Sequence, residues 1–592
     1  MIDATSMRPV LATVVVGVSA SLLTAFAGTG EPPAMIPTHS QEWYQHHILA
    51  VDEDGNGLLP AVSVSGPPDD PRYKANHRQK ICDEDTRNAF LKKNGQISPG
   101  LTVALQGRAP LMEYVSAMFQ AIGERGPSEV IVYIHGGLNN IDGAIVKSAM
   151  LADRLDVEDK FFIGICWNSN LMPTYDQHLL AVREGLHQKE KAIVTAPAML
   201  LADIGGSVVR LPLNLIDFLY QDAYVLNPKA FTRTKLAQAR YNQIKRVYEA
   251  GLKTNLQRLD VSKEKDKRSE FQIWFRDFGR WLITEPVKAS STVFLDTLGV
   301  QPWKNMVRRT RTMFERESEF IPDLKYDDAG SVAAAQKPPF PTAKFIDQLN
   351  YTGRKGAVWH FTSQLEANLI KRDSKNQPTL TLIGHSMGAI VTCEMLERFH
   401  RLAVDNVVLM AAACSIRDFK DKIIPFFQEQ ELRADFAKAA PGQAKLYAPL
   451  IKTHLYNLCL NDTAEHIEPN PGQLDLSQRG SLLTWIDTLY QSPESENDRT
   501  FGRWVNAVLS TDDIPSNLLD RISIKSFGMD RPRKKDSTVY TEVERATKVI
   551  DEPTKHGEFT RYNGPKKRTT NFRFWNTKYR SREEDTNAGT TH

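Results

Sequence analysis

Six short runs of almost wholly apolar residues recur along the chain, and helical patterns separate them. The runs cover residues 129–134, 161–167, 379–383, 406–412, 455–460 and 522–527. Helical stretches occupy 111–123, ahead of the first run, and 389–399, after the third. Unbroken apolar runs are typical of parallel strands that are buried on both faces. We therefore predict an α/β fold with a mostly parallel central sheet and helices on both of its faces.

The segment before the first run predicts a β-hairpin. Residues 44–51 alternate between apolar and polar as a strand does, and the chain then turns through 54–57. An Asp-x-Asp-x-Asn-Gly spacing that begins at Asp52 also resembles the start of a calcium-binding loop. The twelfth position of such a loop would be Ser63, which lacks the bidentate carboxylate that holds calcium. The pattern therefore favours a turn over a metal site.

Residues 168–356 form a long segment without strand signals. An apolar helical stretch at 192–220, broken by prolines and glycines, is followed by strongly charged helices at 232–319. Insertions of this size often form a cap or lid over a working site, so we expect a helical cap here. The apolar stretch carries Asp203 and Arg210, which argues against a simple membrane span. It either packs on the main domain only or also presents an apolar face to lipid.

The N-terminus has the pattern of an export signal. Arg8 precedes an apolar run at 9–24, and Ala25-Phe26-Ala27 offers small residues at both specificity positions of a signal-peptidase site. We expect an exported protein, periplasmic or extracellular, with an uncleaved membrane anchor as the alternative. The predicted organisation is a signal peptide or anchor at 1–27, a linker at 28–40, a core in two parts at 41–167 and 357–580, the cap at 168–356 and a disordered tail at 581–592.

Composition excludes several classes of protein. The chain has 592 residues with 74 basic and 71 acidic side chains, a net charge of +3, which does not favour binding to nucleic acid. Five cysteines are too few for a disulfide framework in so long a chain, and no cysteine or histidine spacing indicates zinc. Cys166, Cys393 and Cys459 lie in apolar runs and are predicted to be buried. We expect neither a metal nor an organic cofactor.

The motif with the clearest chemical meaning is Gly384-His385-Ser386-Met387-Gly388. The apolar run 379–383 leads straight into it and the helix 389–399 leads out. A tight strand-to-helix turn of this kind lifts a serine hydroxyl above the sheet, while Gly384 and Gly388 let neighbouring segments approach closely. The turn also places the Met387 N–H at a helix N-terminus, where it can stabilise an oxyanion.

A second motif, His135-Gly136-Gly137-Leu138, follows the apolar run 129–134 directly. Acyl transfer needs two backbone donors that point at the tetrahedral oxygen, and one of them comes from an early strand-to-helix loop. We expect the N–H of Gly137 or Leu138 to be this donor. His135 and Gly136 are expected to support the loop rather than to transfer protons.

These two motifs, with the strand at 406–412, resemble the α/β-hydrolase superfamily of esterases and lipases. The similarity covers roughly 44–167 and 357–579. In that superfamily the triad follows the chain order serine, acid, histidine. The resemblance implies Ser386 as nucleophile and Asp462, after the run 455–460, as acid, with Glu465 and Asp418 as alternatives. Of the three histidines beyond Asp462, His466 is too close in sequence and His592 is the terminus, so His556 is the expected base.

We therefore expect a serine hydrolase that cleaves a carboxylic ester, of a small molecule or a lipid, through an acyl-enzyme. The same fold also supports amidase, thioesterase and acyltransferase chemistry, and a non-catalytic binding protein on this scaffold is a further alternative. Peripheral membrane contact through the cap is a compatible partner interaction. The pattern leaves the oligomeric state open.

Overall fold

The computed structural model describes residues 39–59, 62–63, 74–75, 80–81, 111–137, 139–156, 158–180, 182–183, 186–187, 189–226, 253–254, 293, 296–315, 355–370, 378–439, 451–460, 464–465, 480–491, 493–510, 514–527, 553 and 555–560. The predicted signal segment, linker and tail therefore lie outside the described residues, apart from positions 39 and 40.

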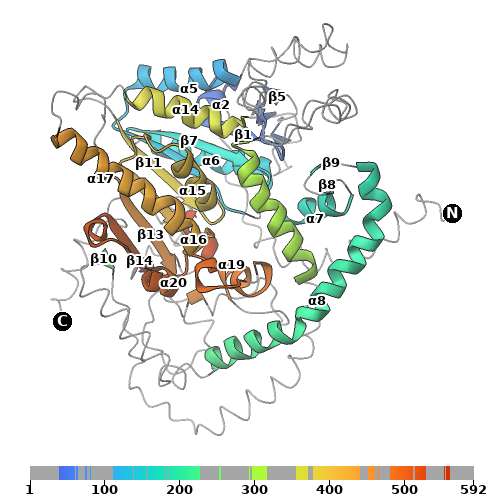
Figure 1. Ribbon diagram of the computed structural model, residues 1–592. Coiled ribbons are helices and arrows are strands. Elements are labelled where there is room, and N and C mark those ends of the chain that lie inside the picture. The colour runs from blue at the N-terminus through green and yellow to red at the C-terminus, as the bar shows by residue number, and fades with distance from the viewer. Residues whose placement is uncertain are drawn as a thin grey trace, which may run out of the picture.

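A ten-stranded sheet forms the centre of the molecule (Figure 1). Its order is β10-β14-β13-β12-β11-β6-β7-β1-β2-β5. Neighbours from β10 to β1 pair in parallel, and β2 and β5 add antiparallel pairs at one edge. The strands are β1 (Ile48–Val51), β2 (Gly57–Leu58), β5 (Lys80–Ile81), β6 (Glu129–Ile134), β7 (Lys160–Trp167), β10 (Lys253–Thr254), β11 (Thr379–His385), β12 (Asn406–Met410), β13 (His454–Leu460) and β14 (Ile522–Phe527). A small separate sheet pairs β3 (Val62–Ser63) with β4 (Lys74–Ala75).

All six apolar runs are confirmed as strands of this sheet, and the predicted α/β class is confirmed with them. The run 129–134 is β6 and the run 522–527 is β14, with identical bounds. Every residue of β6 is buried, as expected for a strand covered on both faces. The apolar pattern was sufficient here because a strand in the middle of a parallel sheet has no solvent-exposed side.

The prediction that 44–51 is one strand is wrong in its first half. Residues Gln41–His47 form helix α2, and only β1 is extended. The Ser40 hydroxyl accepts a hydrogen bond from the Trp43 N–H at 3.1 Å and so caps the helix. Tyr44 and His47, three residues apart, are both buried, because this spacing puts them on one helix face.

The hairpin turn after β1 is confirmed. The Asp52 carboxylate accepts hydrogen bonds from the N–H groups of Asp54 and Asn56 and from the Asn56 amide, at 2.8 to 3.0 Å. Gly55 has a positive φ of 87°, which glycine adopts without a steric cost. Asp52 therefore stabilises a turn, in agreement with the preference for a turn over a calcium loop.

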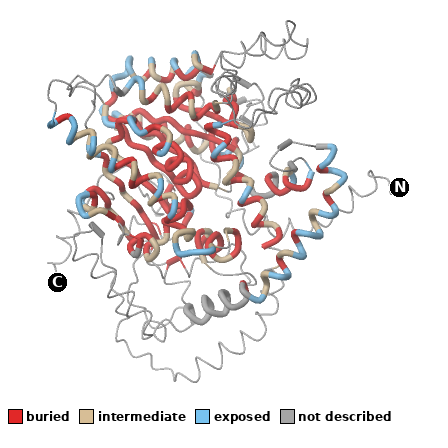
Figure 2. The backbone as a smooth tube through the Cα atoms, in the orientation of Figure 1, coloured by how far each residue is buried: buried red, intermediate tan, exposed pale blue. Residues whose placement is uncertain are grey.

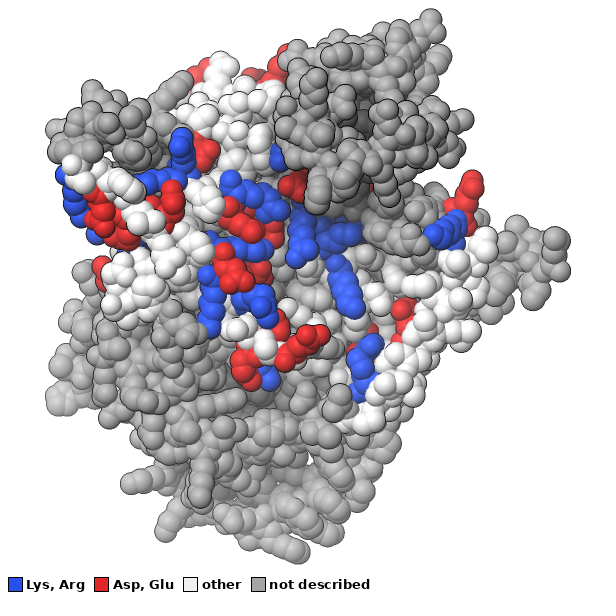
Figure 3. All heavy atoms as spheres, in the orientation of Figure 1, with Lys and Arg blue, Asp and Glu red and all other residues white. Residues whose placement is uncertain are grey.

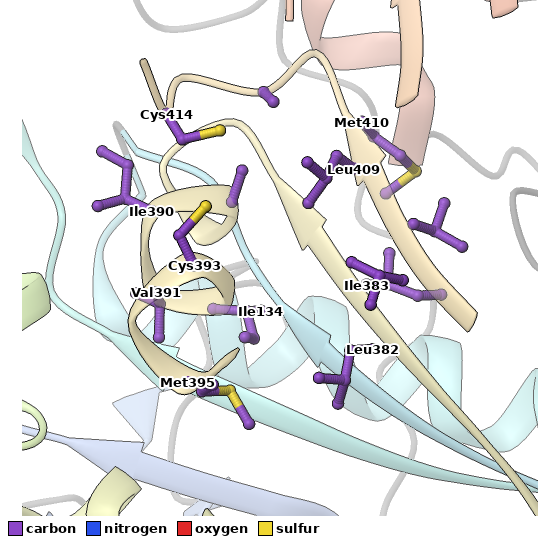
Figure 4. Close-up of a cluster of buried hydrophobic side chains, with 14 of the residues drawn as sticks. Ile134, Leu382, Ile383, Ile390, Val391, Cys393, Met395, Leu409, Met410 and Cys414 are labelled. Atoms are coloured by element: carbon purple, nitrogen blue, oxygen red, sulfur yellow. The ribbon is translucent and has the colours of Figure 1, made fainter. Parts of the chain in front are cut away.

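Helices cover both faces of the sheet (Figure 1). After β6 the chain passes through α6 (Ile141–Asp156) to β7 on one side, whereas after β11 it passes through α15 (Gly388–Arg398) to β12 on the other. Because crossovers between parallel strands are right-handed, these opposite directions place α6 and α15 on opposite faces. On α15 the side chains of Ile390, Val391, Cys393 and Met395 cluster with those of β11 and β12 (Figure 4).

The remaining helices surround this core, and nearly all the central elements are buried (Figure 2). Cys166, Cys393 and Cys459 are buried free cysteines, as predicted. The surrounding helices include α5 (Leu111–Arg125), α14 (Ala357–Ile370), α16 (Ile416–Asp418), η2 (Phe419–Ile423), α17 (Ile424–Ala439), α19 (Leu482–Trp485), η4 (Ile486–Tyr490), η5 (Glu496–Asp498), α20 (Trp504–Leu509), η7 (Ser516–Arg521) and η8 (His556–Thr560).

The segment 168–356 contains short strands that the sequence did not predict. Helix α7 (Leu171–Leu180) is followed by the hairpin of β8 (Val182–Arg183) and β9 (Leu186–His187). Strand β10, from the same segment, pairs with β14 of the main sheet. Two-residue strands carry no readable alternation, so pairing with a neighbour decides them. The cap function of this segment stays a prediction.

Helix α8 (Lys189–Leu226) runs continuously through the predicted breaks at Pro197 and Pro212. Both prolines are exposed, and each removes one backbone N–H from the helix, which bends a helix without ending it. Figure 1 shows α8 curving along the edge of the molecule. By length and composition alone, Glu190–Pro212 is the one helix among the described residues that could cross a membrane.

Candidate active site

The loops after β6 and β11 leave the sheet in opposite directions. Strands β6 and β11 are neighbours in the sheet. The chain crosses from β6 to β7, away from β11, and from β11 to β12, away from β6. In open parallel sheets such a reversal opens a crevice at the carboxyl ends of the strands, where ligands bind. The His135-Gly136-Gly137 loop and Ser386 both lie at this point, since they follow β6 and β11 directly.

Ser386 occupies the strained turn between β11 and α15. Its φ is +51°, in the left-handed region that non-glycine residues rarely adopt. The end of β12 holds its backbone: the Ser386 N–H donates to the Met410 carbonyl at 2.9 Å, and its carbonyl accepts from the Ala413 N–H at 3.0 Å. The Ser386 hydroxyl is buried and has no hydrogen-bond partner among the described residues.

The two flanking glycines allow backbone contacts that any larger residue would block. A Cβ on Gly388 would lie 2.1 Å from the Ile134 carbonyl oxygen at the end of β6. A Cβ on Gly384 would lie 2.6 Å from the Thr392 hydroxyl and 2.8 Å from the Ala389 backbone. Gly388 thus lets α15 begin directly against the end of β6, and Gly384 lets the strand pass under the helix.

The glycine loop after β6 touches the serine turn. A Cβ on Gly136 would lie 2.7 Å from the Ser386 Cβ and 2.7 Å from the His385 Nδ1, and one on Gly137 would lie 2.9 Å from the Met387 sulfur. The structure therefore brings together the two motifs that the sequence analysis singled out, which are about 250 residues apart. Leu138, the alternative oxyanion donor, lies outside the described residues.

His135 orients this loop, because both of its ring nitrogens bond to backbone. Its Nε2 accepts from the Trp167 N–H at 2.9 Å, so its Nδ1 carries the proton and donates to the Gly136 carbonyl at 2.7 Å. Burial lowers the pKa of His135 to about 4, which keeps the ring neutral. The Ser169 hydroxyl and the Asn139 amide also donate to the Gly136 carbonyl. Since a trans peptide points N–H opposite to C=O, the Gly137 N–H faces away from these donors.

His556 lies next to the serine turn, at the start of η8. Its ring centroid is 5.4 Å from that of His385, the residue before Ser386, and its carbonyl oxygen is 3.3 Å from the His385 Nε2. Burial lowers the pKa of His556 to about 4, so the imidazole is neutral near pH 7, as a general base must be. His556, 170 residues beyond Ser386 along the chain, therefore contacts the residue that precedes Ser386, whereas the Ser386 hydroxyl makes no hydrogen bond to the His556 ring.

The three candidate acids differ in their surroundings. Asp462 follows β13, whose carboxyl end lies at the same edge of the sheet as Ser386, but Asp462 itself lies outside the described residues. Glu465 is buried and accepts a hydrogen bond from the Ser481 hydroxyl. Asp418 forms a capping box with Ser415 and an ion pair with Lys422 at 2.9 Å. These contacts favour a structural role for Asp418, and the choice of the acid stays a prediction.

Lys147 and Thr560 also belong to this region, and sequence reasoning missed them. The Lys147 ammonium, on α6, donates to the Thr560 hydroxyl at the end of η8. Burial lowers the pKa of Lys147 to about 8, and its charge in turn helps to lower the pKa of His385 and of His135. A lysine in an amphipathic helix looks like a surface residue, so no sequence signal marked it.

Comparison with known proteins agrees with this architecture. A model of the α/β-hydrolase fold matches residues 333–518, a region that includes Ser386 and Asp462. No curated protein and no solved structure matches the chain. The parallel sheet, the turn at Ser386 and the matched region support the α/β-hydrolase superfamily, and the chain has the fold of a hydrolase-family scaffold.

Proposed function

We propose that the protein is a serine hydrolase that cleaves a carboxylic ester through an acyl-enzyme intermediate. The observation that carries the proposal is the strained Ser386 turn, packed against Gly136 and bordered by the His385–His556 pair. Strain at a buried serine supports a functional constraint, because glycine would adopt the positive φ of 51° at a lower steric cost.

In the first step the Ser386 oxygen attacks the acyl carbonyl, and His556 takes the hydroxyl proton. The carbonyl oxygen becomes an oxyanion, which the N–H of Met387 and that of Gly137 or Leu138 stabilise, each by about 3 kcal/mol. His556 then protonates the leaving alcohol. Asp462 is the proposed acid that orients the imidazole and stabilises its charged form, with Glu465 as the alternative.

In the second step water attacks the acyl-enzyme. His556 accepts a proton from the water, the tetrahedral oxygen again occupies the same two N–H groups, and the ester bond to Ser386 breaks. His556 returns the proton to the serine oxygen. The products are a carboxylic acid and the alcohol released earlier, and the balanced reaction needs only water.

A fluorophosphonate probe tests the nucleophile, because it phosphonylates only an activated serine. We expect wild type to be labelled and Ser386→Ala and His556→Ala to be unlabelled. Equal labelling of Ser386→Ala would refute the assignment. Absence of labelling in correctly folded wild-type protein would favour the alternative of a non-catalytic binding protein on this scaffold.

The acid is identified by three matched amide variants. Asp462→Asn and Glu465→Gln are compared with Asp418→Asn, whose carboxylate caps α16. We expect Asp462→Asn to lower the labelling rate by about 10⁴-fold, as in other triads, and Asp418→Asn to leave it unchanged. A p-nitrophenyl ester series of increasing acyl length then defines the substrate class, and preference for long chains would indicate a lipid ester.

A further inference from the structure

The exposed large hydrophobic side chains of the described residues gather on one helix. Nine such side chains are exposed, and six of them lie on α8. They are Ile193, Val194, Leu201, Ile204, Val208 and Val209, with exposed fractions from 40% to 80%. We call this set the α8 outer face. Single exposed aliphatic residues are ordinary, but a continuous cluster marks an interaction site.

The polar residues of the same stretch point the other way and are paired inside the protein. The Asp203 carboxylate lies 3.1 Å from the His178 ring on α7, and Arg210 donates to the Asp296 carboxylate at 2.7 and 3.1 Å. Asp203 and Asp296 are both buried. An ordinary surface helix buries its apolar side, whereas α8 buries its polar side and exposes its apolar side.

The exposed positions between Ile193 and Pro212 carry no charge and no aromatic ring. Besides the α8 outer face, the exposed residues in this stretch are Pro197, Ala198, Ala202, Gly205 and Pro212. Protein interfaces rely on aromatic and arginine anchors with a hydrogen-bonding rim. A surface of aliphatic groups without side-chain donors or acceptors fits hydrocarbon instead. Figure 3 shows the outer side of α8 as an almost uninterrupted white ridge.

The helix is long enough to cross a bilayer, but its contacts exclude that orientation. Only 22% of its most apolar window is buried, unlike the core helix of a soluble protein. Its inner side is joined to α7 through Asp203. Through Ser207 and Arg210 it is joined to Thr297 and Asp296 of the helix at 296–312. That helix carries Lys304, Arg308, Arg309 and Arg311, which could not enter the hydrocarbon core without a large cost.

We propose that the α8 outer face binds a phospholipid bilayer, with α8 parallel to the membrane plane and its aliphatic side chains at the boundary between headgroups and acyl chains. The face is uncharged, so binding depends on buried apolar area and not on anionic lipid. Glu190 and Lys191, exposed at the start of the helix, mark where the contact ends. The inference does not depend on the proposed chemistry at Ser386.

An environment-sensitive fluorophore tests this contact in the full chain. The probe (NBD) is attached to Leu201→Cys in a Cys82→Ser background, since the other four cysteines are buried. On adding phosphatidylcholine vesicles we expect a blue shift, quenching by lipids that carry shallow spin labels, and no change with salt. The control probe is at Leu432→Cys, which is 55% exposed on α17, and is expected to stay unchanged.

Two aspartate variants, one on α8 and one on α17, test whether the α8 outer face itself binds the vesicles. Val194→Asp with Leu201→Asp and Val209→Asp should lower vesicle binding at least about tenfold, whereas Leu432→Asp with Phe436→Asp should not. All five positions are exposed, and circular dichroism confirms folding. The N-terminal apolar run is the same in every variant, so any difference reports on α8. A probe at 201 that stays in water while the protein floats with vesicles contradicts the proposal. A blue shift that occurs without lipid and grows with protein concentration would show that the α8 outer face binds a second copy of the protein. This result would also overturn the proposal.

Discussion

The Nε2 of His385 lies 3.3 Å from the carbonyl oxygen of His556, and the two rings are 5.4 Å apart. The contact joins the turn that carries Ser386 to a short helix 171 residues further along the chain. Because the oxygen of a carbonyl accepts, the proton of His385 must be on Nε2. Burial lowers the pKa of His385 well below its usual value, so the ring is neutral. The neutral His385 ring then holds η8 in place by donating from Nε2 to the His556 carbonyl.

Removing this donor should disturb the position of His556. We expect His385→Ala to slow fluorophosphonate labelling of Ser386 about tenfold, which corresponds to about 1.4 kcal/mol. His385→Gln keeps an N–H donor and should recover part of the rate. The pair separates positioning from bulk stability, provided that both melting temperatures are measured. Wild-type labelling by His385→Ala would contradict the positioning role.

A glycine-to-alanine pair tests the close approach of α15 to β6. Gly388→Ala places a methyl group 2.1 Å from the Ile134 carbonyl oxygen, so we expect a loss of about 2–4 kcal/mol in the free energy of unfolding. Gly557→Ala, beside His556, meets nothing within 4 Å and should change stability by less than about 0.5 kcal/mol. Urea unfolding measures both. Equal stability of the two variants would be evidence against the close contact.

The strain at Ser386 predicts a gain of stability when the residue is replaced by glycine. Ser386→Gly relieves the cost of a positive φ and removes a buried hydroxyl without a partner among the described residues, so we expect stability to rise by about 1 kcal/mol. Ser386→Ala removes the hydroxyl only and should gain less. Both variants are expected to be inactive. A lower melting temperature for Ser386→Gly than for Ser386→Ala would contradict the strain.

Buried histidines should make the fold sensitive to mild acid. The pKa of His135 is about 4 in the folded protein, below its ordinary value of 6.5, so between these values the unfolded chain binds a proton that the folded chain does not. Stability therefore falls as the pH drops from 6.5 towards 4, by up to about 3 kcal/mol for this one residue. The pKa values of His47, His385 and His556 are lowered in the same direction.

The variant His135→Asn isolates one of these contributions. It should be less stable than wild type at pH 7.5, because the bonds to Trp167 and Gly136 are weakened. Its stability should, however, decline less steeply than that of wild type as the pH falls. The two slopes should differ by at most about 1.4 kcal/mol per pH unit. Urea unfolding at pH 7.5, 6 and 5 gives the slopes. Identical slopes for variant and wild type would mean that His135 titrates normally in the folded state.

Apolar patterning alone was enough to locate the six core strands. A residue such as Ile131 or Val408 is buried whichever neighbour its strand has, so its burial is determined locally. The same holds for the turn at Asp52, where an aspartate and a glycine fit a turn without help from the rest of the chain. Where several outcomes were locally possible, the pattern failed: residues 44–47 are helical because Ser40 caps them and because Tyr44 and His47 pack on one side.

The sequence by itself determined the α/β class, the strand positions and the strand–turn–helix context of Ser386. Only the tertiary structure decided that Gly136 packs against Ser386, that His385 and His556 meet, and that Lys147 donates to Thr560 at the end of η8. It also decided that α8 buries its polar side and exposes its aliphatic one. The reason is physical: periodicity and turn chemistry act over a few residues. Contacts between residues that are hundreds of positions apart depend on strand order, which the spacing of apolar runs does not encode.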